Sequence, residues 1–213
     1  RPVSKNTYYQ RLLQACIKNT IPFRYILNDV WYASAENMMF VRYTLKKHFV
    51  MPLKSNRKVA LSKAEKRQGK YQSVDTVAMK EHSTKEIYLE GVDFPLVLMK
   101  QVFENEDGSR GVLYLVTSHL TLTYEQITTL YRTRWRVEEY HKSLKQNASL
   151  EKSPTRTVAT QTTHFFAALC AYIKLEILKI STKKSHTTLK LSIYMQALLT
   201  AYEQLRSMKP IAF

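Results

Sequence analysis

The stretch Tyr131–Lys145, which reads YRTRWRVEEYHKSLK, constrains the fold of this chain more than any other stretch. Its apolar residues recur at helical spacing, which predicts one helix from about Tyr124 to about Gln146. Thr123 and Gln126 have the spacing of a capping box at the start of that helix. The apolar residues expected to face a core are Leu130, Val137, Tyr140 and Leu144.

The polar face of this predicted helix is unusual. Because an α-helix turns about 100° per residue, side chains three, four and seven residues apart gather within an arc of about 60°. The residues in this arc are Tyr131, Arg134, Glu138 and Lys145, and Lys142 points into it as well. Glu139 points about 100° away and is interpreted as a surface partner of Arg136 or Lys142. The alternative is a solvated helix face with ion pairs such as Arg134 with Glu138.

The charge of the chain indicates a polyanionic partner. Lysine and arginine total 33 against 17 aspartates and glutamates, a net charge of +16. DNA or RNA is therefore the first candidate, and a ribosomal or merely basic surface protein is the alternative. Cys16 and Cys170 have no paired spacing, which excludes a disulfide framework or a zinc site and fits a reducing cytosol. The longest apolar run, Phe165–Ile173, is too short to span a bilayer, so we expect no membrane partner.

The order of predicted elements indicates an α/β fold in three parts, which are residues 1–53, a basic and β-rich insertion at residues 54–118, and a helical part at residues 119–213. The elements expected in the first part are a helix over residues 4–20, a strand Phe23–Leu27, a helix Ala35–Lys47 capped by Ser34, and a strand His48–Leu53. Those expected afterwards are the β pieces Tyr71–Met79, Lys85–Leu89, Pro95–Phe103 and Gly111–Thr117, a hairpin turn at residues 105–109, a loop Ser149–Thr157, and helices Val158–Ile180 and Thr188–Met208.

Asp29 follows a short apolar run, Phe23–Leu27, that fits a buried strand. A carboxylate just beyond the carboxyl end of such a strand is a common place for chemistry in α/β folds. A turn or cap residue fits the same position, and this residue alone leaves both interpretations open. The nearby Trp31 is interpreted as a core residue. The basic run Lys54–Lys70 is either a solvated loop or a contact for DNA phosphates.

Two motifs resemble those of a known family. The spacing Tyr131-(2)-Arg134-(3)-Glu138-(6)-Lys145 resembles the Y-R-E-K signature of bacterial insertion-sequence DDE transposases. The segment Asn28–Ser34 is similar to the one that carries the second catalytic aspartate in that family. The order of elements also resembles their ribonuclease-H-like fold, which has a β insertion before the helix of the catalytic glutamate.

The resemblance implies a nuclease and strand transferase that acts at insertion-sequence ends. It implies that Asp29 and Glu138 are catalytic metal ligands for two Mg²⁺ or Mn²⁺ ions. The residues expected to hold DNA phosphates are Tyr131, Arg134, Lys142 and Lys145, with Lys152 and Arg156 in the following loop. The implied partner is double-stranded DNA, both transposon ends and target, bound by a homodimer. The implied location is the bacterial cytoplasm, at the nucleoid.

The chain departs from the family's pattern at the first catalytic aspartate, and this departure lowers the activity that we expect. The first catalytic aspartate of the family lies on the first strand of the sheet, and Asp75, Asp93 and Asp107 come too late in the order to replace it. We therefore expect a partial ribonuclease-H-like fold that lacks its first strands and is inactive in cleavage until its N-terminal part completes it. The alternatives are a catalytically inactive DNA-binding or regulatory transposase fragment and, as a third hypothesis, a basic RNA-binding domain.

Overall fold

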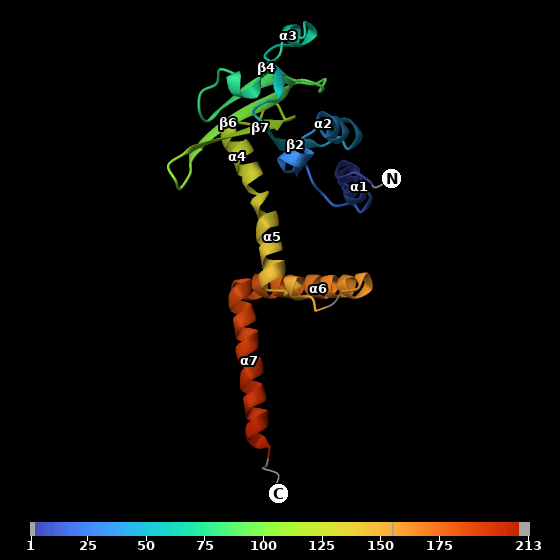
Figure 1. Cartoon of the computed structure of the whole chain (residues 1–213), viewed down its shortest axis with the longest axis vertical. Helices are drawn as coiled ribbons and strands as arrows, with labels where there is room; N and C mark the ends of the chain where they lie inside the picture. Colours follow the sequence, from blue (N-terminus) through green and yellow to red (C-terminus); the bar gives the residue numbers. More distant parts are fainter. Residues whose placement is uncertain (1–2, 155, 209–213) are drawn as a thin grey trace. The chain divides into compact units, whose positions relative to one another are not determined.

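The computed structural model describes residues 3–154 and 156–208, and the chain forms two compact units, residues 1–134 and residues 135–213. The predicted loop Ser149–Thr157 includes position 155, which lies outside the described residues. The predicted α/β class with a helical C-terminal part is confirmed, because the first unit holds a seven-stranded sheet and the second is helical (Figure 1). Strands from residues 54–118 join the same sheet as those from residues 1–53. The predicted three-part division stays a prediction.

The sheet of the first unit is mixed, with the strand order β1-β2-β7-β6-β5-β3-β4. Only the β1–β2 pair is parallel among the described strand pairs, and the others are antiparallel. The strands are β1 (Tyr25–Leu27), β2 (His48–Leu53), β3 (Lys58–Ala60), β4 (Gln72–Ser73), β5 (Ser83–Leu89), β6 (Leu96–Glu104) and β7 (Arg110–Thr117). The short β1 therefore forms one edge of the described sheet.

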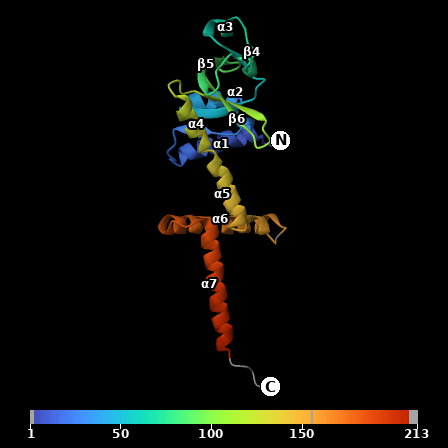
Figure 2. The same ribbon diagram turned by 90° about the vertical axis from the view of Figure 1, so that its left-hand side faces the viewer.

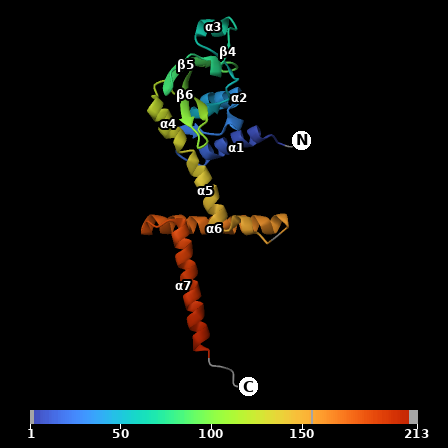
Figure 3. The ribbon, with the colours of Figure 1, turned by 60° about the vertical axis from the view of Figure 1, so that its left-hand side comes forward.

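Helices cover both faces of this sheet. α1 (Lys5–Lys18) and α2 (Ala35–Met39) pack on one face, and α4 (Tyr124–Arg132) packs on the other. The alternation along β2 shows this directly, because Phe49 and Met51 lie in the core of the first face while Val50 packs with Ile127 of α4. Figures 2 and 3 show α4 and the pair of α1 and α2 from two further directions.

Most predicted helix starts are fixed by side-chain caps. Ser34 Oγ accepts a hydrogen bond from the Asn37 amide at 3.1 Å, and both bonds of the capping box between Thr123 and Gln126 are present. The predicted helix Ala35–Lys47 is shorter than expected. Its α-helical part ends at Met39, and a π-helical turn, Phe40–Thr44, follows.

The basic run is more ordered than a solvated loop. It contains β3 and the short helix α3 (Lys63–Arg67). Two of its cations hold backbone carbonyls, since Arg57 Nη1 donates to Ala33 O at 3.2 Å and Lys66 Nζ donates to Val92 O at 2.5 Å.

The predicted strand Tyr71–Met79 is wrong beyond β4. A 3-10 turn over Val74–Thr76 (η3) follows β4, and it buries both Val74 and Val77. Apolar residues three positions apart suit one helical turn better than a strand. In contrast, the hairpin turn at residues 105–109 is confirmed, with Asn105 N donating to Ser109 O at 2.8 Å and Gly108 at a φ of +77°.

The predicted single helix from Tyr124 to Gln146 is wrong, because it is interrupted at residues 133–134. α4 ends at Arg132, and α5 (Trp135–Gln146) begins after the break. Thr133 Oγ1 donates to Leu130 O at 2.6 Å, and the Arg134 amide donates to Tyr131 O at 3.0 Å. These bonds to carbonyls three residues back replace the regular helical ladder, as threonine hydroxyls often do. The boundary between the two units along the chain follows directly, between Arg134 and Trp135.

The second unit consists of α5, the turn η4 (Leu150–Lys152), α6 (Val158–Thr182) and α7 (His186–Ser207). Its small core contains Leu144, Ala148 and Ala168, with Tyr140 and Tyr172 packed beside them. The two predicted C-terminal helices are confirmed within a few residues. Val137 is half exposed and does not join the core, so its predicted inward orientation is wrong. No helix among the described residues is both long and apolar enough to cross a membrane.

The buried ring of Phe49 should contribute strongly to the stability of the first unit. Phe49 is completely buried, so Phe49→Ala should lower the free energy of unfolding by about 3–5 kcal/mol through cavity formation. Phe103, on β6, is 44% exposed, and Phe103→Ala should cost less than about 1.5 kcal/mol. Urea unfolding of both variants measures the difference, and equal losses would contradict this account of the core.

A histidine pair predicts how stability depends on pH. The His48 and His119 rings stack with centroids 4.5 Å apart, and burial lowers the pKa of both, assisted by the charges of Arg24 and Arg42. Each pKa in the folded state lies below the ordinary value of 6.5, so the unfolded chain binds protons more readily than the folded chain. The contribution of the pair to the free energy of unfolding is therefore highest above pH 6.5 and decreases as the pH falls below that value.

Urea unfolding at pH 7.5 and 5.5 should therefore show lower stability at the acidic pH. His119→Gln should make the decrease smaller, and the control His141→Gln, on an exposed site of α5, should leave it unchanged. An equal decrease in wild type and His119→Gln would contradict the assignment.

Candidate functional site

Asp29 lies at the carboxyl end of β1, where the parallel pairing of β1 and β2 ends. It is exposed, and it is also the N-cap of the 3-10 turn Val30–Tyr32 (η1), with Oδ1 accepting from the Val30 amide at 2.6 Å. The cap interpretation is therefore correct for one oxygen of the carboxylate. A carboxylate has a second oxygen, so the cap does not by itself prevent metal binding.

Tyr131 and Arg134 lie beside this end of β1. Tyr131 Oη donates to Asn28 O at 3.5 Å, and the Arg134 guanidinium lies 5.7 Å from the centroid of the Tyr131 ring. Burial raises the pKa of Tyr131, Arg134 opposes that change, and the charge of Asp29 adds to it. The fold of the first unit thus brings a neutral phenol and a guanidinium close to the Asp29 carboxylate.

Trp31 differs from the sequence prediction. It is 79% exposed, so its interpretation as a core residue is wrong. Lys54 Nζ lies 5.8 Å from the centroid of its ring, a cation–π contact. The buried residue at the end of this turn is Ala33, and the half-buried Tyr32 stacks its ring on that of Tyr9, with centroids 4.8 Å apart. Trp31 and Tyr32 are adjacent aromatic residues, and their order in the sequence does not indicate which of the two would be exposed.

The remaining predicted residues lie in the second unit. Glu138, Lys142 and Lys145 line one shallow cavity of about 320 Å³ along α5. Other residues around this cavity are His141, Gln146 and Glu151. The predicted grouping of a carboxylate with two lysines is therefore present within this unit. Lys152, on η4, and Arg156 are both exposed, and neither lines this cavity.

Glu151 is the member of this cavity that the sequence analysis missed. Its Oε1 lies 3.1 Å from Lys145 Nζ, and both side chains are more than half exposed. An ion pair with this exposure contributes little to stability and can be exchanged for another anion. Its sequence separation of six residues from Lys145 gave no helical spacing from which the pair could be predicted.

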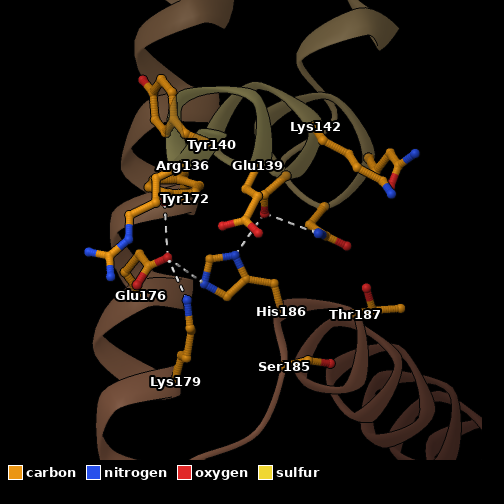
Figure 4. Close-up of a pocket in the computed structure, with 13 residues that line it drawn as sticks. Arg136, Glu139, Tyr140, Lys142, Tyr172, Glu176, Lys179, Ser185, His186 and Thr187 are labelled. Atoms are coloured by element: carbon orange, nitrogen blue, oxygen red, sulfur yellow. Dashed lines mark hydrogen bonds and ion pairs between the residues drawn. The ribbon is translucent and has the colours of Figure 1, made fainter. Parts of the chain in front are cut away.

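A second cavity in the same unit, of about 890 Å³, is lined by residues of α5, α6 and α7 (Figure 4). His186, at the start of α7, makes a 2.7 Å hydrogen bond through Nδ1 to Ser143 Oγ of α5. Its Nε2 lies 3.2 Å from Glu176 Oε1 of α6, although the angles are not those of a hydrogen bond.

Glu176 balances opposing effects at this junction. Burial raises its pKa, but hydrogen bonds from Tyr172 and Lys179 and the nearby positive charges outweigh burial, so the pKa is lowered overall. Because the carboxylate is already held by these donors, we interpret the cavity as a structural junction of α5, α6 and α7.

The oxygen donors of the chain fit a magnesium ion in type. No group of three His, Cys, Asp or Glu side chains with metal-site geometry occurs within residues 3–154 and 156–208. Mg²⁺ is normally held by only one or two protein carboxylates, with waters and substrate phosphates completing its shell. Asp29, in the first unit, and Glu138, in the second, are the two carboxylates predicted for this role, which stays a prediction. Asn28, next to Asp29, has a buried Oδ1 without a hydrogen-bond partner in the described part of the chain.

Comparison with known proteins identifies the family to which this chain belongs. No curated protein matches this chain. A family model described as a transposase DDE domain matches residues 2–174, which is most of the 213-residue chain and includes Asp29, Tyr131, Arg134, Glu138 and Lys145. With its mixed α/β sheet and helical C-terminal part, the chain belongs to the transposase DDE domain family.

Proposed function

We propose that this protein takes part in metal-dependent DNA strand cleavage and strand transfer, with Asp29 and Glu138 as ligands for Mg²⁺ or Mn²⁺. The observation that carries the proposal is the family match over residues 2–174, which includes both carboxylates. Asp29 lies at the carboxyl end of β1, beside Tyr131, and this position supports its proposed role as a metal ligand. Bound divalent ions supply activation of a water or a DNA 3′-hydroxyl and stabilisation of the leaving oxygen.

The chain's own residues bind and orient the DNA. A tyrosine whose pKa is raised stays protonated at neutral pH, so Tyr131 can donate a hydrogen bond to a phosphate oxygen. Arg134 can grip a phosphate by two hydrogen bonds, and Lys142 and Lys145 can each attract a DNA phosphate as a point charge.

Further contacts extend the proposed DNA surface. Lys152 and Arg156 are exposed and follow α5 directly, so they bind the backbone without reading its sequence. Trp31, exposed next to Lys54 and two residues from Asp29, offers a ring on which an unpaired base can stack. The partner is double-stranded DNA at element ends and target sites in a bacterial cell, bound by two copies of the chain.

A DNA-binding protein without cleavage activity is the second candidate. The net charge of +16 and the exposed lysines support DNA binding under either hypothesis, because phosphate contacts do not need a metal. The two candidates differ in whether the carboxylates bind metal and whether DNA is cut, so the experiment below separates them.

Glu138→Gln should remove metal binding while keeping DNA binding. A change from carboxylate to amide keeps the shape of the side chain but loses its charge, so Mn²⁺ affinity in the presence of DNA should fall at least about tenfold. Glu139→Gln is the matched control, because it makes the same change one position along α5, outside the cavity of Glu138. Calorimetry with Mn²⁺ and gel-shift assays with end DNA measure the two properties.

The outcomes distinguish the hypotheses. Loss of Mn²⁺ binding in Glu138→Gln, with Mn²⁺ binding kept in Glu139→Gln, supports the metal role. Equal Mn²⁺ affinity in the two variants would show that Glu138 is the wrong carboxylate. DNA binding by a wild-type chain that does not bind Mn²⁺ would favour the second candidate.

Lys145 and Glu151 should have opposite effects on DNA affinity. Lys145→Ala should weaken binding and lower the slope of log affinity against log salt by about 1, because one phosphate contact is lost. Glu151→Gln should strengthen binding, because it removes a negative charge and releases Lys145 from its 3.1 Å ion pair. Lys179→Ala is the control, since Lys179 lies on α6 and does not line the cavity of Glu138. Salt titrations of end DNA binding measure all three, and an unchanged slope in Lys145→Ala would refute the contact.

A further inference from the structure

A cluster of aromatic and basic side chains lies where β1 and β2 begin, at the other end of β1 from Asp29. The parallel register pairs Tyr25 with His48, and the chain brings His119 against both rings just after β7 ends. The rings of His48 and His119 stack with centroids 4.5 Å apart, and the Tyr25 ring lies 6.0 Å and 5.8 Å from them. The Arg24 guanidinium lies 5.5 Å from the centroid of the Tyr25 ring. We call Arg24, Tyr25, His48 and His119 the histidine cluster.

The histidine cluster gathers basic groups without a carboxylate to balance them. Arg24 is exposed, and in the part of the chain that the structure describes neither it nor the two histidines form an ion pair. Burial lowers the pKa of both histidines, and the charges of Arg24 and Arg42 lower it further. Basic groups that lie together without a counter-charge attract an anion, because the anion offsets their mutual repulsion.

One nitrogen of each histidine ring is available to bind such an anion. His48 Nδ1 makes a hydrogen bond with Ser118 Oγ at 3.2 Å, and His119 Nδ1 makes one with Tyr25 Oη at 2.5 Å. When these hydroxyls donate, each ring carries its proton on Nε2. Among the described residues, His48 Nε2 has no hydrogen-bond partner and His119 Nε2 has only Thr121 Oγ1, at 3.4 Å. Both Nε2 atoms can therefore donate to an oxygen of an anion.

The histidine cluster lies on the same face of the sheet as Tyr131. Side chains two residues apart on a strand point the same way, so Tyr25 shares the face of Leu27. Leu27 and Tyr131 pack against the same buried cluster beneath α4. The four residue steps from Tyr25 to Asp29 span at most about 13 Å, which a DNA strand covers in about four base steps. The backbone of one duplex bound near Asp29 can therefore reach the histidine cluster.

We propose that the histidine cluster binds a phosphate group of the DNA backbone, and that it binds more tightly when the histidines are protonated. A bound phosphate places a negative charge beside both rings, and this charge favours their protonated form. Binding therefore takes up protons, so the DNA affinity should increase as the pH falls. The inference rests on the DNA partner of the proposed function, but the phosphate contact requires neither Asp29 nor a metal.

The test measures DNA affinity at two pH values without metal. Fluorescence anisotropy with random-sequence duplex DNA in EDTA should show a wild-type affinity at least about threefold higher at pH 6.0 than at pH 7.5. His119→Gln should lose most of this gain, because glutamine does not titrate. His82→Gln is the matched control and should keep the gain, since it changes an exposed histidine of the same unit outside the cluster. The gain should also remain in Lys145→Ala, because Lys145 belongs to the second unit.

A second variant tests the histidine cluster without changing a histidine. Arg24→Gln changes an exposed side chain, so the fold should be kept. It should lower the DNA affinity at least about threefold at both pH values, because one cation near the phosphate is lost, while the gain on acidification remains.

Three results would overturn the proposal. The first is an equal gain in wild type and His119→Gln, and the second is an unchanged DNA affinity in Arg24→Gln. The third is binding of sulfate, a small anion of phosphate shape, that shifts the NMR signals of the His119 ring while His119→Gln binds DNA like wild type at both pH values. In that case the cluster binds a free anion and not DNA. None of these results would alter the Mn²⁺ comparison of Glu138→Gln with Glu139→Gln.

Discussion

The parallel pairing of β1 with β2 determines where the candidate groups of the first unit lie. It aligns Tyr25 with His48 and Leu27 with Val50, so the chain leaves the sheet at Asn28 and Asp29. Burial of β2 between helices on both faces makes this pairing stable, because its side chains alternate between two apolar cores. The carboxylate, its cap and the neighbouring Tyr131 all depend on this exit from the sheet. A shift of one residue would turn each side chain of β1 to the opposite face.

The break in the helix at residues 133–134 changes how the four residues of the Y-R-E-K signature are arranged. On one continuous helix, Tyr131, Arg134, Glu138 and Lys145 would share a face by geometry alone. Because α4 ends at Arg132, the first two residues belong to the sheet-bearing unit and the last two to the helical unit. Threonine hydroxyls that bond to the backbone supply the local cause. The signature is thus divided between the two units of the chain.

The second unit has a charged surface on α5 and an apolar surface on α7. α5 presents Lys142 and Lys145 beside Glu138, and the exposed Lys145 forms an ion pair with Glu151. α7 presents apolar side chains with no charge along the middle of the helix. The junction at His186 joins these elements, because it binds α5 and lies against Glu176 of α6.

The sequence by itself determined the α/β class, the positions of most strands and helices, the capping box and the family, since these depend on local periodicity, turn chemistry and residue spacing. It could not determine the break after Arg132, the exposure of Trp31 or the partnership of Glu151 with Lys145. Those features follow from competition between backbone bonds and from contacts of residues without helical or strand spacing. Only the tertiary structure decided them, because burial and charge pairing arise from neighbours that the order of the residues does not specify.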